Sequence, residues 1–163
     1  MRRIAYSEEA TIENDNHSRI GCLAYPLGYT AKEPAMSLTV SPGLLDQARN
    51  GSVDDDAFAA CIQASLPYAW QLIGDLTVRL HASGADFADN QAPPPDEAAR
   101  GQLLRMMASD AMRAAAERHF GVRLAFQNCH RAAVFRPTAT EVLAEFTTAR
   151  AQLLNQSPEL VNC

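Results

Sequence analysis

A stripe of apolar residues at helical spacing constrains the fold of this chain most strongly. At about 100° per residue, seven apolar side chains fall on one narrow face: Phe58, Ile62, Leu66, Ala69, Ile73, Leu76 and Leu80. Such a face must be buried, so we expect the core to form around one helix ending near His81. Pro67 interrupts the backbone hydrogen bonding, but the stripe keeps its phase beyond it, which predicts one kinked helix.

Shorter elements are predicted on both sides of this helix. Ser41 caps a short helix, residues 97–120 form a long one, and a last helix bears the apolar residues between 142 and 154. Residues 86–95 are expected to be an extended connector, and the alternation after Gly121 predicts a two-stranded hairpin. The expected fold is therefore an α-rich α+β domain with about four helices, one of them Pro-kinked, and one small β-hairpin.

Two segments have the spacing of a helix capping box. Ser52 is followed by Asp54 and Asp55, and Thr138 is followed by Glu141. We interpret the aspartates at 54, 55 and 56 as residues that start a helix and not as a metal cluster, because carboxylates stabilise the positive end of a helix dipole.

The composition changes at Met36. The only lysine, Lys32, three of the four tyrosines and three of the five isoleucines precede it, whereas alanine and arginine are concentrated after it, as in proteins of GC-rich genomes. Codons for Lys32-Glu33-Pro34 can also contain a ribosome-binding sequence. We therefore predict that residues 1–35 are a disordered or non-native leader and that residues 36–163 form a single α-rich globular domain.

The charge and hydropathy of the chain exclude several classes of function. With 14 basic and 19 acidic residues, the net charge of −5 disfavours nucleic acid and anionic membranes as partners. The chain has neither a stretch of about 18 apolar residues that could span a membrane nor a signal peptide, which predicts a cytoplasmic protein. A winged-helix DNA-binding regulator is the least favoured function, although Arg123, Arg131 and Arg136 decorate the hairpin.

The predicted hairpin turn holds the densest cluster of polar side chains. Cys129 and His130 are the candidate catalytic residues, and Gln127, Asn128 and Arg131 are candidate ligand-binding residues. Neighbours in sequence rarely face one another well enough for proton transfer, so a base for the thiol would more plausibly come from a helix, as His81 or His119. The alternative interpretation is a solvated turn made of turn-forming residues.

Arg100 is the remaining candidate ligand-binding residue. It lies near the start of a helix, where a cation is unfavourable unless an anion compensates it. The anion could be Asp96, Asp89 or Glu159, or Arg100 and Arg131 could converge on the carboxylate or phosphate of a small ligand. The four cysteines have no Cys-x-x-Cys spacing, so no metal site and no cofactor are predicted.

A resemblance to a known family covers four stretches: Phe87–Gln91, Pro93–Glu97, Arg118–Arg131 and Leu153–Leu160. These resemble a family of uncharacterised conserved proteins from streptomycetes and related actinomycetes, and the resemblance extends over Met36 to Cys163. No activity, cofactor or catalytic residue is assigned to that family. The resemblance therefore implies no functional residue here.

Three functions remain open from the sequence. The favoured one is a non-catalytic binding or accessory protein that acts through protein contacts or through a small ligand near the hairpin turn. The alternative is a small metal-free enzyme that uses Cys129 or His130, with arginine anchoring an anionic substrate. The partner is expected to be a protein or a small molecule, and a homodimer is compatible with the sequence.

Overall fold

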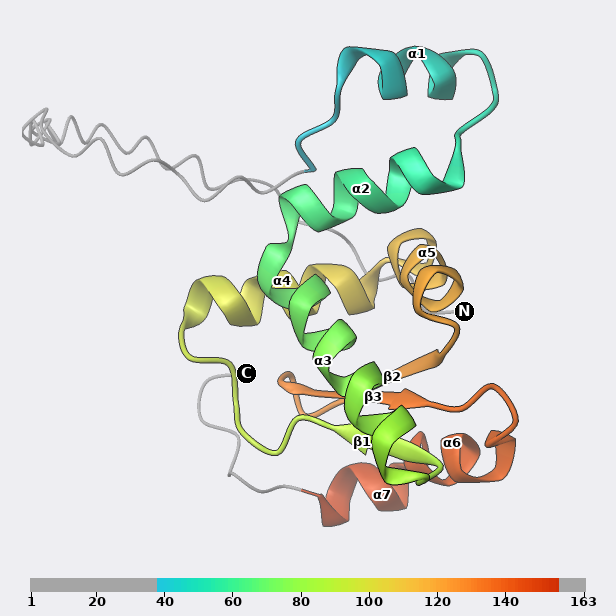
Figure 1. Cartoon of the computed structure of the whole chain (residues 1–163). Coiled ribbons are helices and arrows are strands. Elements are labelled where there is room, and N and C mark those ends of the chain that lie inside the picture. Colours follow the sequence, from blue (N-terminus) through green and yellow to red (C-terminus); the bar gives the residue numbers. More distant parts are fainter. Residues whose placement is uncertain (1–37, 156–163) are drawn as a thin grey trace, which may run out of the picture. The chain divides into compact units, whose positions relative to one another are not determined.

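A computed structural model describes residues 38–155 of the chain (Figure 1). Within these residues the chain is α+β and forms seven helices and a three-stranded antiparallel sheet. In chain order the elements are α1 (Pro42–Arg49), α2 (Asp55–Ser65), α3 (Pro67–Ser83), β1 (Phe87–Asp89), α4 (Glu97–Ala108), α5 (Asp110–Phe120), β2 (Arg123–Gln127), β3 (Arg131–Phe135), α6 (Thr140–Phe146) and α7 (Ala149–Leu154). The prediction of about four helices and one hairpin is therefore wrong. The predicted leader, residues 1–35, lies outside the described residues.

The central apolar stripe belongs to two helices and not to one kinked helix. Leu66, between α2 and α3, has φ −129° and ψ 56°, outside the helical region. A proline disfavours helical backbone at the residue before it, and Pro67 begins α3. The stripe is nevertheless buried as predicted, since Ile62, Ile73 and Leu80 have no exposed surface.

The other two long helices are also each divided into two. Ser109 has extended backbone and its hydroxyl accepts a hydrogen bond from the Met112 N–H, so it ends α4 and caps α5. Thr148 caps α7 in the same way by accepting from the Ala151 N–H at 3.1 Å. Both side chains satisfy backbone donors at a new helix start, which is why these helices break there.

The predicted helix caps have mixed outcomes. Ser41 caps α1 as predicted, by accepting from the Leu44 N–H at 3.2 Å. Asp54, and not Ser52, caps α2 through the Ala57 N–H at 2.8 Å. The second capping box is wrong, because α6 follows Ala139 without a side-chain cap.

The sheet gains a strand that was predicted to be part of a connector. β1 pairs with β3 through Phe87 opposite Phe135 and Asp89 opposite Ala133, which gives the strand order β1-β3-β2. The hairpin itself is present, with Leu124 opposite Val134. Because β3 is central, β1 and β2 are the two edges of the sheet.

Both faces of the sheet are covered by helices (Figure 1). Leu124, Ala132 and Val134 face the larger cluster, which contains buried residues of α2, α3, α4 and α5. Ala133 and Phe135 face the smaller cluster with Phe146 of α6. The sheet thus lies between a layer formed by α3, α4 and α5 and a layer formed by α6.

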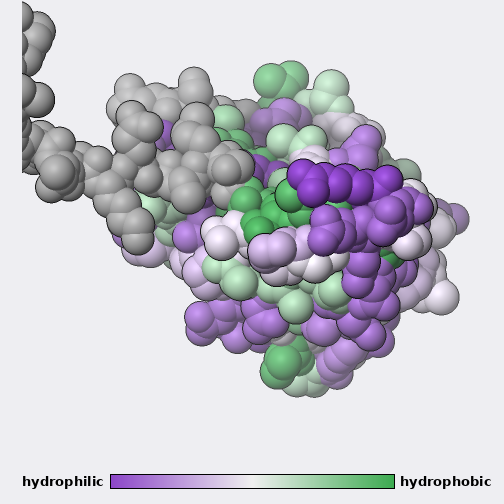
Figure 2. Space-filling model, turned by 90° about the horizontal axis from the view of Figure 1, so that it is seen from above, coloured by the Kyte–Doolittle hydropathy of each residue, from purple (hydrophilic) through white to green (hydrophobic). Residues whose placement is uncertain are grey.

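The surface is mixed in polarity. Seen from above Figure 1, hydrophilic residues dominate, and apolar residues show between them (Figure 2). In the part of the chain that the structure covers, no helix has both the length and the hydrophobicity needed to cross a membrane.

Candidate functional site

The polar cluster predicted at the hairpin turn is present, and most of it is buried. Asn128 and Cys129 have φ of 53° and 55°, and the His130 N–H donates to the Gln127 carbonyl at 3.4 Å. Positive φ at both residues is left-handed backbone, which glycine adopts freely and asparagine more readily than most other residues. Gln127 and Asn128 are each only 3% exposed. Gln127 and Asn128 therefore do not form the solvated turn that was the alternative interpretation of the sequence.

Arg131, on the central strand β3, is neutralised by the carboxylate of Asp89 on the neighbouring edge strand β1. Its Nε donates to Oδ2 of Asp89 at 2.6 Å, and Nη2 forms an ion pair with the same oxygen. The other oxygen, Oδ1, accepts from the Gln91 amide at 3.3 Å. The guanidinium carbon also lies 5.3 Å from the centre of the Phe146 ring. Asp89 is buried, so this ion pair fixes β1 against β3.

Asn90 holds the turn to the end of β1. Its amide nitrogen donates to the carbonyls of Ala92 at 2.9 Å and His130 at 2.8 Å. Its amide oxygen accepts from the Ala132 N–H at 2.6 Å. Asn90 could not be recognised from the sequence, because His130 and Ala132 lie 40 and 42 residues away from it.

The amides of the turn reach the two last helices. Gln127 donates to the carbonyl of Phe146, and Asn128 donates to the carbonyl of Asn155. Gln152 of α7 in turn donates to the Asn128 side-chain oxygen. These amides therefore tie the hairpin to α6 and α7.

A small cavity of about 280 Å³ remains beside the turn. It is lined by Asp89, Asn90, Gln91, His130, Arg131, Leu154 and Asn155. Arg100 does not line this cavity, and its guanidinium forms an ion pair with Glu97 in the first turn of α4. Glu159, one of the acids expected to pair with Arg100, lies outside the described residues. His119 and His81 do not line the cavity either, and His119 packs 4.8 Å from the Trp70 ring. The cavity thus contains Arg131 and His130 but not Arg100 or a second histidine.

We expect Cys129→Gly to increase the free energy of unfolding by up to about 1 kcal/mol, because glycine adopts positive φ without the steric cost that cysteine bears. The change places glycine directly after Asn128, so that both positions with positive φ carry residues that tolerate it. Urea unfolding followed by circular dichroism measures the difference. A loss of more than 1 kcal/mol would show that the Cys129 side chain stabilises the turn.

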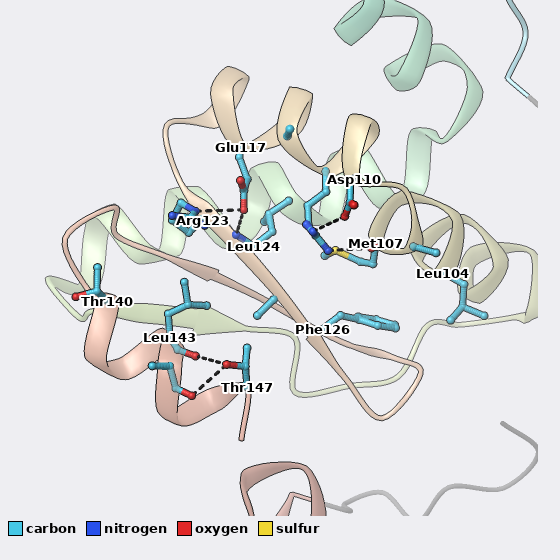
Figure 3. Close-up of a pocket in the computed structure, with 15 residues that line it drawn as sticks. Leu104, Met107, Asp110, Glu117, Arg123, Leu124, Phe126, Thr140, Leu143 and Thr147 are labelled. Atoms are coloured by element: carbon cyan, nitrogen blue, oxygen red, sulfur yellow. Dashed lines mark hydrogen bonds and ion pairs between the residues drawn. The ribbon is translucent and has the colours of Figure 1, made fainter. Parts of the chain in front are cut away.

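A larger groove follows the edge of β2 and was missed from the sequence (Figure 3). Its volume is about 860 Å³. One wall comes from α4 and α5, the other from α6, and four consecutive residues of β2 form its base. The side chains lining it are mostly apolar and include Leu104, Met107, Ala114, Phe126, Leu143 and Ala144.

The backbone of β2 directs hydrogen-bonding groups into this groove. Both backbone groups of Ala132 in β3 bond to Asn90, on the β1 side. Because the direction alternates along a strand, Leu124 and Phe126 point their N–H and C=O groups away from β3. The Leu124 N–H confirms this direction by donating to the Glu117 carboxylate at 2.7 Å.

The charged side chains of the groove are already paired with one another. Arg113 forms an ion pair with Asp110 at 2.6 Å, and Arg123 lies 3.5 Å from Glu117 (Figure 3). Two arginines and two carboxylates leave the groove without net charge. An uncharged, apolar occupant fits such walls better than an anion.

Within residues 38–155 no three His, Cys, Asp or Glu side chains are grouped to hold a metal ion.

Comparison with other proteins identifies a family. No curated protein and no solved structure matches the chain. Residues 36–163 match the NucS shadow ORF family, whose short name is KH_NucS_shadow, and the chain belongs to that family.

Proposed function

We propose that this chain is a non-catalytic binding protein that contacts a protein partner through the groove beside β2. The observation that carries the proposal is the groove itself, in which apolar walls flank a strand edge that no other described strand covers. Exposed apolar surface of this kind is typical of protein interaction sites.

The hydrogen bonds at the hairpin turn favour binding over catalysis. A catalytic arginine or amide must be available to the substrate, whereas Arg131 is paired with Asp89, and Gln127 is bonded to the Phe146 carbonyl. Their arrangement holds β1, the hairpin and α6 together. An enzyme with Cys129 and His130 as catalytic residues is for this reason the alternative function. Binding of a small ligand at the turn is less favoured than binding of a protein in the groove.

An RNA-binding function is suggested by the family's short name. KH designates an RNA-binding module that clamps the nucleotide backbone with a Gly-x-x-Gly loop. No two of the eight glycines here are three residues apart, so that loop is absent, and the net charge is −5. The paired charges of the groove also argue against RNA binding, because both arginines of the groove already have a carboxylate partner.

We expect Leu104→Glu to remove the partner that copurifies with the chain from its source cells, with at least a tenfold decrease in the amount recovered. Leu104 lines the groove and is 39% exposed, so the charge disturbs the binding surface more than the core. Quantitative mass spectrometry of the copurified proteins measures the effect. Val78→Glu is the matched control, because Val78 is 68% exposed on α3 and does not line the groove. Equal losses in both variants would contradict the proposal.

A further inference from the structure

The groove beside β2 has the geometry of a site for one added strand. β2 is an edge strand, and its backbone groups point into the groove at alternate residues. Unpaired strand edges attract extended chains, and proteins usually cover or protect them. Here Glu117 protects one group, the Leu124 N–H, and leaves the Leu124 carbonyl and both backbone groups of Phe126 directed into the groove.

The walls determine the side chains that an added strand would carry. Successive side chains of a strand point to opposite faces, so they would meet α4 and α5 on one side and α6 on the other. Met107 and Ala114 face it from the first wall, and Leu143 and Ala144 from the second. Apolar side chains line part of both walls, so small apolar residues fit on both faces of the added strand.

The two ion pairs of the groove limit its charge. Each arginine there already has a carboxylate partner, as described above. A charged side chain entering the groove would lose its hydration without gaining an unpaired counter-ion. The occupant is therefore uncharged along the part that lies in the groove.

The recessed position of the edge favours a peptide over a second copy of the chain. In a pair of copies joined through β2, each strand would bring its own α5 and α6 toward the same helices of the other copy. A single extended segment brings no such layers with it. β2 has five residues and is about 17 Å long, which matches a segment of similar length.

Building on the proposed function, we infer that the partner binds as an extended, uncharged, apolar peptide segment that adds a fourth strand to the sheet at β2. The new strand order is β1-β3-β2-peptide. The Phe126 N–H donates to a peptide carbonyl, and the Phe126 and Leu124 carbonyls accept peptide N–H groups. This is strand addition, in which main-chain hydrogen bonds give affinity and the walls give specificity.

The test uses a synthetic peptide, acetyl-Ser-Thr-Val-Ala-Val-Thr-Ser-amide, titrated into the isotope-labelled full chain and followed by NMR. We expect the amide signals of Leu124–Gln127 to shift and the exchange of the Phe126 N–H to slow. The same peptide with its three central amides N-methylated should not bind, because it cannot donate to the edge. Equal binding of the methylated peptide, or no binding of either peptide, would overturn strand addition.

Two variants at one residue separate backbone pairing from side-chain contact. Phe126→Pro removes an N–H that faces away from β3, which an edge strand tolerates, whereas Phe126→Ala keeps the N–H and removes the same ring. We expect Phe126→Pro to weaken peptide binding about tenfold beyond Phe126→Ala, as the loss of a hydrogen bond and a steric clash predict. Equal affinities would contradict the inference.

If Phe126→Pro does not fold, Ala144→Arg replaces it in the test. Ala144 is exposed on α6 and lines the groove, so the longer side chain blocks the peptide without disturbing the core. Ala98→Arg is its matched control, because Ala98 is exposed on α4 and does not line the groove. Loss of binding in Ala144→Arg alone supports the inference, and equal binding in the two variants refutes it.

Other occupants of the groove give distinct results. If a mixed-sequence single-stranded RNA 12-mer binds and shifts the Leu124–Gln127 signals, the occupant of the groove is nucleic acid and the peptide inference is wrong. If analytical ultracentrifugation shows a dimer and Ala144→Arg dissociates it, the occupant of the groove is a second copy of the chain. If Leu104→Glu removes the copurified partner but no peptide binds, strand addition fails while the proposed function stands.

Discussion

Asp89→Ala is expected to lower the free energy of unfolding by about 3 kcal/mol, because it leaves the Arg131 guanidinium partly buried without its carboxylate. The side chain of Arg131 is 21% exposed, so water replaces the lost partner only in part. Arg131 also joins β3 to the Phe146 ring and lies against Gln127. The loss should therefore affect the hairpin turn and α6 as well as β1. Urea unfolding at neutral pH measures it.

Two comparisons test the cause of this loss. Asp46→Ala removes the carboxylate of an exposed ion pair with Arg49 and should change stability by less than about 0.5 kcal/mol. Adding Arg131→Met to Asp89→Ala should recover part of the loss, because the unpaired charge is then gone. A loss of under 1 kcal/mol in Asp89→Ala would mean that this ion pair does not hold β1 to the hairpin.

Phe135→Ala is expected to lower the free energy of unfolding by about 3–5 kcal/mol, which is the usual cost of removing a buried ring. Phe135 lies on the central strand and has no exposed surface. Its ring stacks on Phe87 of β1 at 5.4 Å and meets Phe146 of α6 edge-on at 5.3 Å. The cavity left behind therefore weakens the contacts of the sheet with α6.

Hydrogen exchange of α6 provides a second measurement on the same variant. The amides of Leu143 and Phe146 should exchange faster in Phe135→Ala, because the ring that holds α6 on the sheet is missing. Leu153→Ala, at a residue 72% exposed on α7, should cost less than about 0.5 kcal/mol. Unchanged protection of α6 would contradict the packing of this helix on Phe135.

The buried helix faces could be predicted from the sequence, but the helix breaks could not. The spacing of Ile62, Ile73 and Leu80 identified a helix face on which these three side chains have no exposed surface. Ser109 and Thr148 are polar residues within helical patterns, and serine or threonine occurs both inside helices and at caps. The apolar pattern continued across both breaks, so periodicity alone indicated continuous helices.

The hairpin turn could be predicted as a cluster, but the positions of its partners could not. Gln127 and Arg131 are neighbours through the turn, which the sequence shows directly. Asp89 reaches Arg131 only because β1 pairs with β3, a contact between residues 42 positions apart. A three-residue strand in a proline-rich segment has too little pattern to be recognised.

The groove depends on the same long-range pairing. The alternation of Leu124 and Phe126 predicted a strand, but its position at the edge of the sheet follows from the place of β3 between β1 and β2. Leu104 and Leu143 come from helices on opposite faces of the sheet. The sequence places them 39 residues apart, with no motif that joins them.

Site-specific photo-crosslinking tests most directly the central claim, that the groove beside β2 binds a protein partner. A benzophenone amino acid is placed at Leu104 in the groove, or at Val78 outside it as the control, in the full chain expressed in its source cells. We predict one discrete adduct from position 104, joined to an apolar segment of the partner, and none from position 78. No adduct from position 104, or the same adducts from both positions, would contradict the account.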